Sequence, residues 1–229
     1  MSSKRYKKLP EKTKTLQSDT INNLLLLVKK NCTTKFDESI DLNMQINNKQ
    51  KKGEINIRTI VNMPSGTGKK VKVAVICEEE KIQGAKSAGA EIVGGDDLID
   101  KIKGGDLNFE KLICTPSMMV KHSKLGKILG PKGLMPNPKL GTVNPDVEKA
   151  VKEAKSGQVE IKNDKDGNIG FSIGKKSFSD DKLINNFNAS IDVLEKEKSN
   201  NTVKGELVKS AFVTSTMGVS YKLKIGKSI

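Results

Sequence analysis

The sequence predicts an α/β fold in two domains, with one domain inserted into the other. Between residues 71 and 156, short apolar segments typical of strands alternate with helical segments, whereas the flanking regions have the pattern of strands joined by turns. The charge divides in the same way, because residues 67–157 carry a net charge of +4 and the two ends together carry +10. We therefore expect an outer domain of residues 1–66 and 158–229 around an inserted domain of residues 67–157.

The N-terminal region predicts a helix at about residues 20–31 and strands around residues 36–45 and 54–62. These two strands have no sheet of their own nearby in the sequence. We therefore expect them to pair with strands from the C-terminal region, which makes the outer domain discontinuous.

The middle region predicts strands at residues 71–76, 90–95 and 111–115, separated by helices at residues 80–90 and 96–105. A capped helix is predicted at residues 144–157. Alternation of this kind is typical of a small parallel sheet with helices around it.

The C-terminal region predicts two strands within residues 158–178 about an Asp166-Gly167 turn, and a helix at residues 180–198. Residues 205–225 predict further strands, broken near Gly218. The helices at 20–31 and 180–198 can cover one face of an antiparallel sheet, which gives the outer domain the form of an α/β sandwich.

The charge favours a polyanionic partner, since 41 Lys and Arg against 27 Asp and Glu give +14 and a pI near 9.5. Eight aromatic residues are few for a platform that stacks successive bases, so folded RNA read by its shape fits better. The longest apolar run, residues 24–28, is too short to span a bilayer, and no signal peptide follows the basic start. We expect a cytoplasmic protein without a membrane partner.

Nucleotide and metal motifs fail on inspection. PSGTGKK at residues 64–70 resembles a phosphate-binding loop, but Met63 occupies the first glycine position, Lys70 replaces the Ser or Thr, and the segment precedes its strand. The segment from Asp164 resembles a calcium loop, yet Ile169 replaces its glycine and Lys175 its final glutamate. We expect no cofactor and no metal.

The remaining reactive residues favour structural roles. Cys32, Cys77 and Cys114 match no zinc spacing, and we interpret them as reduced core residues. His122 lies in a basic stretch where a helix end is one interpretation and a catalytic base the other, and no nearby residue suggests a partner for a base. The proline- and glycine-rich residues 129–145 must form a shaped loop, because proline donates no backbone hydrogen bond.

Seven motifs give the sequence a resemblance to a known family. They are KRY at 4–6, TKFDESID at 34–41, PSGTGK at 64–69, AGAEIVGGDDL at 88–98, KLGKILGPKGLMPNPKLGTV at 124–143, GQVEIKNDKDG at 157–167 and TSTMG at 214–218. In order and spacing the chain resembles the family of ribosomal large-subunit protein one, the protein of the mobile ribosomal stalk. The resemblance covers nearly the whole chain and implies a Rossmann-like second domain inserted into the first.

The resemblance implies a non-enzymatic protein that binds large-subunit ribosomal RNA, helps release exit-site tRNA and represses translation of its own mRNA. It implies a monomer off the ribosome. The RNA contacts it implies are Lys35, Phe36, Glu38, Ser39, Thr214, Thr216, Met217 and Gly218. Phe36 and Met217 would be core residues on sequence pattern alone, because apolar side chains usually point inward.

Secondary contacts and a hinge complete the expectations. The possible secondary RNA contacts are Lys4, Arg5, Lys132, Lys139, Lys162 and Lys165. Gly66, Gly68 and Gly157 lie where the chain crosses between the domains, and we expect a hinge there. The chain departs from the family's usual residues at Thr59, Ser65 and Gly170, and each departure can remove a contact. The alternative, a nucleotide-binding enzyme using the inserted domain, lacks a phosphate loop and a catalytic group.

Overall fold

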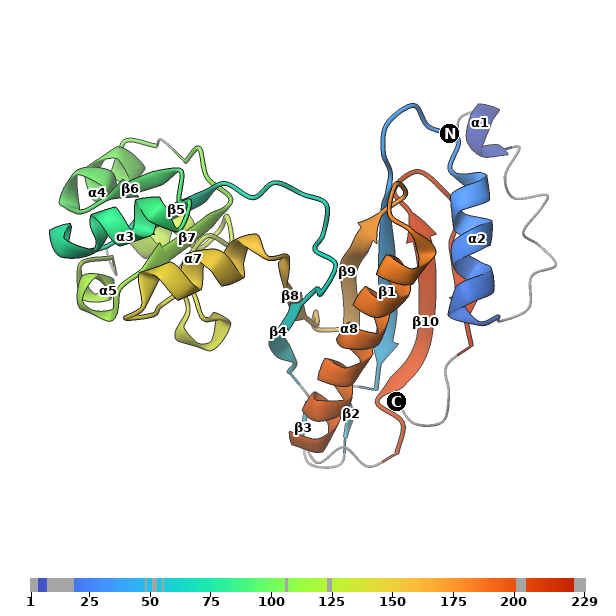
Figure 1. Cartoon of the computed structure of the whole chain (residues 1–229). Coiled ribbons are helices and arrows are strands. Elements are labelled where there is room, and N and C mark those ends of the chain that lie inside the picture. The colour runs from blue at the N-terminus through green and yellow to red at the C-terminus, as the bar shows by residue number, and fades with distance from the viewer. Residues whose placement is uncertain are drawn as a thin grey trace. The chain divides into compact units, whose positions relative to one another are not determined.

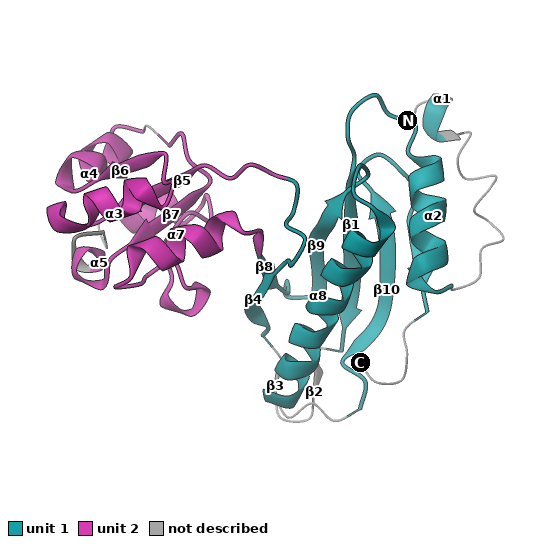
Figure 2. Ribbon diagram, in the orientation of Figure 1, with its two compact units in different colours: residues 1–68, 159–229 teal, residues 69–158 magenta. Residues whose placement is uncertain are grey.

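A computed structural model describes residues 4–7, 19–47, 49–50, 53–54, 56–105, 107–122, 125–200 and 205–224. The chain divides into two compact units, which Figure 2 shows in different colours. Unit 1 contains residues 1–68 and 159–229, and unit 2 contains residues 69–158. The domains expected from the sequence are residues 1–66 with 158–229 and residues 67–157.

A four-stranded antiparallel sheet forms the centre of unit 1, with the strand order β11-β10-β1-β9. β1 (Ser39–Ile46) lies between β10 (Val208–Ser215) and β9 (Asn168–Lys175), and β11 (Tyr221–Leu223) forms the edge beside β10. An N-terminal strand is thus the inner strand between two C-terminal ones. The two ends of the chain form one sheet, as Figure 1 shows.

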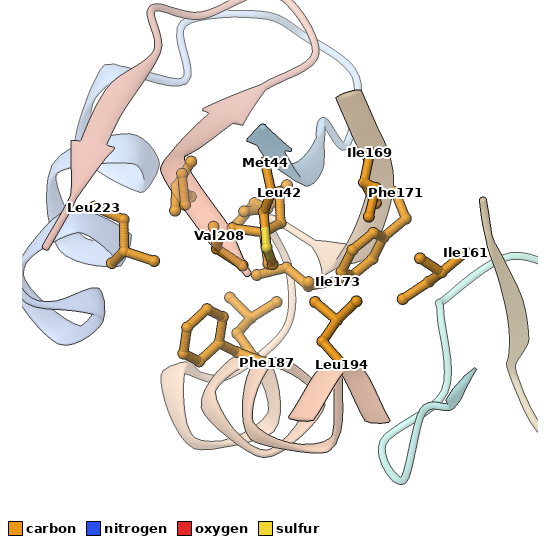
Figure 3. Close-up of a cluster of buried hydrophobic side chains, with 14 of the residues drawn as sticks. Leu42, Met44, Ile161, Ile169, Phe171, Ile173, Phe187, Leu194, Val208 and Leu223 are labelled. Atoms are coloured by element: carbon orange, nitrogen blue, oxygen red, sulfur yellow. The ribbon is translucent and has the colours of Figure 1, made fainter. Parts of the chain in front are cut away.

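Two helices, α2 (Ile21–Asn31) and α8 (Asp180–Asn200), pack on one face of this sheet. Strand β1 alternates strictly, so that Ile40, Leu42, Met44 and Ile46 are buried toward the helices. Figure 3 shows apolar side chains of β1 and β9 meeting Phe187 and Leu194 of α8. This core fixes the register of the sheet, because a slip of one residue would expose every inward side chain.

Smaller elements surround the sheet of unit 1. α1 (Lys4–Lys7) begins the described chain, β2 (Lys49–Gln50) pairs with β3 (Gly53–Glu54), and β4 (Arg58–Asn62) pairs with β8 (Gln158–Lys162). The expected hairpin about Asp166-Gly167 has both strands, but its arms enter different sheets and share one bridge, Asn163 with Ile169. β8 does not form a ladder with β9, because β8 pairs with β4 in a separate two-stranded sheet.

Unit 2 is built on a parallel sheet with the order β6-β5-β7, formed by β6 (Ile92–Gly94), β5 (Val73–Ile76) and β7 (Lys111–Cys114). Val73 and Val75 face α3 (Ile82–Ser87) and α7 (Val147–Lys155), with η2 (Glu79–Lys81) just before α3. Ala74 and Ile76 face α4 (Asp96–Lys103), α5 (Pro116–His122) and α6 (Gly126–Leu129). The expected α/β fold is therefore present in both units.

The proline- and glycine-rich loop lies in unit 2 and includes η4 (Pro138–Leu140). Asn137 caps η4 by accepting from the backbone N–H of Lys139, and the Thr142 hydroxyl accepts from the N–H of Asn137. Residues 142–144 then bond to both backbone groups of Cys114 and run parallel to β7. This part of the loop thus extends the edge of the sheet beside β7.

Candidate nucleic-acid interface

The two segments expected to contact RNA meet at one end of the unit 1 sheet. β1 and β10 are antiparallel with Ile40 opposite Ser215, so the start of β1 lies beside the turn that follows β10. The N–H of Ser39 donates to Thr216 Oγ1 over 2.9 Å, and the N–H of Thr216 donates to the Ser39 carbonyl over 3.1 Å. These reciprocal bonds hold the turn against the strand.

Glu38 joins the same two segments from beneath. Its side chain is 0 % exposed, and its carboxylate accepts from the Thr34 hydroxyl over 2.7 Å and from the N–H of Met217 over 3.1 Å. Burial acts to raise the pKa of Glu38, but hydrogen bonds from Thr34, Ser215 and Met217 outweigh burial and lower it. The ionised carboxylate is therefore matched by internal donors, so its oxygens organise the two segments.

Two large apolar side chains project from this organised surface. Phe36 is 52 % exposed and Met217 is 49 % exposed, although the pattern of the sequence alone predicts both in the core. β1 begins only at Ser39, so Phe36 lies outside the expected strand and escapes its alternation. Exposed apolar side chains of this size, next to hydroxyls and cations, suit contacts with ribose or a base.

Cations surround the apolar pair. Lys35 is exposed, and the Arg5 guanidinium of α1 donates to Thr33 Oγ1 over 2.7 Å and to the Met217 carbonyl over 2.6 Å. Lys175 Nζ donates to Ser39 Oγ over 2.9 Å, and Lys176 Nζ donates to the Cys32 carbonyl over 3.0 Å. α1, the loop after α2 and the ends of β9 and β10 thus converge on one basic rim.

Gly218 is required by the packing of its turn. A Cβ added there would lie 2.2 Å from Ser215 Oγ, a contact that real side chains do not make. Ser215 is buried, and its hydroxyl is among the donors that lower the pKa of Glu38. A larger residue at Gly218 would therefore disturb the carboxylate network together with the turn.

The other predicted contacts lie elsewhere. Thr214 is half-buried on β10, and Lys162 and Lys165 are exposed near the opposite end of the sheet, where β1 ends beside the turn before β9. Lys132 and Lys139 are exposed on the loop of unit 2. The side chains of Lys4 and His122 lie outside the described residues. Sequence reasoning missed the roles of Thr34, Ser215, Lys175 and Lys176, which only their positions in space reveal.

The first crossing between the units is held by unit 1. Asn186 on α8 is 0 % exposed; its amide donates to the Gly66 carbonyl over 2.9 Å, and its oxygen accepts from the N–H of Ser65 over 3.0 Å. Gly66, Gly68 and Gly157 all have positive φ, and a Cβ at Gly68 would meet Lys175 at 2.8 Å. Gly66 and Gly68 are therefore fixed within unit 1.

Other chemistries receive little support from the described residues. They contain no group of His, Cys, Asp or Glu side chains suited to a metal ion, and none of their helices is long and apolar enough to cross a membrane. Cys32, Cys77 and Cys114 are free and buried, as expected. Burial raises the pKa of all three thiols, and that of Cys114 to about 11, which keeps them unreactive.

Comparisons with known proteins agree on one family. A model of the ribosomal protein L1p/L10e family matches residues 28–219. The chain is 72 % identical to the large ribosomal subunit protein uL1 of Pelagibacter ubique over the full length of both. It is 46 % identical to uL1 of Rickettsia africae, covering 96 % of the chain and 92 % of that protein. It is also 44 % identical to uL1c of Arabidopsis thaliana, covering 99 % of the chain and 65 % of that protein.

Proposed function

The chain belongs to the ribosomal protein L1 family and is a structural, non-enzymatic protein of the large ribosomal subunit, and on this premise we propose that unit 1 binds large-subunit ribosomal RNA. The observation that carries the proposal is the pairing of exposed Phe36 and Met217 on two segments that one buried carboxylate joins. A soluble protein gains nothing from exposing two large apolar side chains on a basic surface unless a partner covers them.

Each group has a defined part in this interface. Lys35 and the remaining donors of Arg5 contact phosphates, while Phe36 and Met217 pack against ribose or base. Thr216 and Ser39 offer hydroxyl oxygens to 2′-hydroxyls, although both already make internal hydrogen bonds. Glu38, which the resemblance implies as a contact, instead positions the two segments, because its oxygens are engaged by protein donors.

The test is a competition experiment with a folded stalk fragment of large-subunit ribosomal RNA and bulk tRNA, at several salt concentrations. We expect the wild type to prefer the fragment by about a thousandfold or more, and the Phe36→Ala/Met217→Ala variant to lose most of that preference. The slope of affinity against salt should not change, since neither residue contacts a phosphate. Equal binding of all RNAs by the wild type would contradict the proposal.

Two finer activities extend this proposal. Lys132 and Lys139 on the loop of unit 2 are exposed and positively charged, which suits a contact with exit-site tRNA. Repression of the chain's own mRNA requires only that this mRNA present the same folded shape to unit 1. A binding assay with the leader of that mRNA, in which the stalk fragment competes for the Phe36 and Met217 surface, tests the second activity.

We also propose a hinge between the units whose first pivot follows Gly68. Asn186 fixes Ser65 and Gly66 to unit 1, and packing against Lys175 and Phe178 fixes Gly68. In the second crossing, Lys111 Nζ donates to the Gln158 carbonyl over 2.8 Å, which holds that residue to unit 2. Resonance energy transfer between fluorescent labels on the two units measures the distribution of distances between them. This distribution should broaden when Gly is inserted after Lys69 and should not change when Gly66 is replaced by Asn.

A further inference from the structure

The face of the unit 1 sheet that points away from α2 and α8 includes the exposed residues Asn168, Gly170 and Lys222. Asp41, Asn43 and Gln45 of β1 point outward, and Asn43 is exposed. The strand register places outward residues in rows across the sheet. These rows are Thr214, Asp41 and Ser172, then Lys222, Phe212, Asn43 and Gly170, then Ser210, Gln45 and Asn168.

The middle row contains a pocket. A hollow of about 430 Å³ is lined by residues of β1, β9 and β10 from the second and third rows, by their neighbours Met44 and Ile169, and by Asp164. Phe212 is its half-buried aromatic residue. Gly170 contributes no side chain, and a Cβ there would lie 2.8 Å from Asn43 Oδ1. A larger residue at this position would displace Asn43, so Gly170 keeps the pocket open.

The polar groups of the pocket differ in what they can still bind. The Asp164 carboxylate accepts from the N–H of Asn168 over 2.7 Å and from the side-chain amide of Asn168 over 3.0 Å. The carboxylate and this amide are therefore already bonded to each other within the turn. Among the described residues, no hydrogen bond involves the side-chain amides of Asn43 and Gln45. Each amide offers a donor and an acceptor beside an aromatic ring, which is the combination that recognises the edge and face of a base.

We propose that this pocket binds one unpaired nucleobase of the ribosomal RNA held by unit 1, with the base stacked on Phe212 and its edge bonded to Asn43 and Gln45. The inference rests on the proposed function. Adenine suits the amides best, because an Asn or Gln side chain can pair with its donor and acceptor together. Lys222, exposed opposite Phe212 on β11, supplies a cation for the adjoining phosphate.

Continuity and charge favour RNA over a protein partner. The first row of the open face contains Thr214 and follows Ser39, so the pocket lies about 13 Å along the sheet from the proposed interface, at 3.3 Å per residue. The face has one aromatic residue among polar ones, so it lacks the apolar area that a protein partner would need. A single ring stacks one base rather than a strand.

The experiment uses the full chain and the folded stalk fragment, with 2-aminopurine replacing each unpaired base in turn. Phe212→Leu should weaken binding about tenfold, as expected for one lost stacking contact, and Phe212→Tyr should restore the wild-type affinity. Asn43→Ala should also weaken binding. One 2-aminopurine position should report stacking in the wild type but not in Phe212→Leu.

Matched controls separate this inference from the proposed function. Phe187→Leu changes a buried aromatic of α8, which packs on the other face of the same sheet, and its affinity should equal that of the wild type. If Phe212→Leu and Asn43→Ala bind like the wild type while the wild type still prefers the fragment, the pocket is not an RNA site and the proposed function stands. If millimolar AMP occupies the pocket and the RNA does not displace it, the assignment to RNA is overturned.

Discussion

The two units are both α/β, but they differ in the polar groups that they bury. Among the described residues, unit 1 buries Glu38, Asn186, Ser190 and Ser215, and unit 2 buries Thr115. Glu38 and Asn186 each join distant segments by several hydrogen bonds, whereas Thr115 Oγ1 has no hydrogen-bond partner in the part of the chain that the structure describes. Buried polar groups that have hydrogen-bond partners favour one arrangement of the chain over others. Among the described residues, Glu38 and Asn186 of unit 1 are such groups.

The comparison separates fold from function. Unit 2 has the parallel sheet on which many proteins bind nucleotides, yet the strand β5 is followed by Glu78, Glu79 and Glu80 rather than by a glycine-rich turn. Three carboxylates would repel a phosphate at that place. The antiparallel sheet of unit 1 is not a nucleotide-binding fold, but apolar, cationic and hydroxyl groups lie together at one of its ends. The side chains, and not the fold class, therefore indicate where the binding site lies.

Asn186→Ala should have the largest effect on stability. It leaves the N–H of Ser65 and the carbonyls of Gly66 and Ile173 without their partner, so the free energy of unfolding should fall by about 3 kcal/mol. Urea denaturation measures this change. Asn23→Ala, which removes an exposed side chain bonded to Asp19, is the control and should cost under about 1 kcal/mol. Equal effects would remove the distinction between buried and exposed amides.

Glu38→Gln should cost about 2 kcal/mol of unfolding free energy, because the amide would point a donor at a backbone or hydroxyl donor. The same variant should weaken binding of the ribosomal RNA fragment, since Phe36 and Met217 would lose their common support. Glu160→Gln, which alters an exposed pair with Arg58, is the matched control and should change stability by less than about 1 kcal/mol.

The stability difference between the wild type and Glu38→Gln should depend on pH. Folding lowers the pKa of Glu38, so its contribution is complete above the ordinary glutamate value of about 4.3 and is lost as the pH falls through the lower folded value. Burial raises the pKa of Asp41, which acts in the opposite sense but is common to both proteins. Urea titrations between pH 3 and 7 should show the difference shrinking below about pH 4.

Thr115→Val should have the smallest effect and the opposite sign. The buried hydroxyl of Thr115 has no hydrogen-bond partner among the described residues, so replacing it by a methyl group removes a desolvated polar atom. We expect a gain of under about 1 kcal/mol in a thermal or urea melt. A loss of 1 kcal/mol or more would show that the hydroxyl has a role in unit 2 and would weaken the contrast between the units.

The sequence predicts most elements because their signals are local. The helix predicted at residues 144–157 is α7, capped by Asp146, whose carboxylate accepts from the N–H of Lys149 over 3.2 Å. α5 and α6 were missed, since residues 116–129 mix glycine, lysine and short apolar runs without a clear period. The pairing of β8 with β4 was also missed, because strand partners far apart in sequence leave no local mark.

The candidate site was predicted as a set of residues but not as a mechanism. The resemblance implied Glu38 as a contact, and only its burial shows that it supports its neighbours. The exposure of Phe36 depends on where β1 begins, which the apolar pattern does not determine. Asn186 had a detectable signal, since it interrupts the apolar stripe of Leu183, Phe187 and Leu194 on α8, and a polar residue in such a stripe needs a partner.

The central claim is that unit 1 binds and recognises the ribosomal RNA, whereas unit 2 does not. Ultraviolet cross-linking of the full chain to the folded stalk fragment, followed by mass spectrometry of the joined peptides, tests it most directly. The account predicts cross-links at Phe36 and Met217, and a further one at Phe212 if the pocket holds a base. Cross-links confined to the loop around Lys132 and Lys139, with none in unit 1, would contradict it.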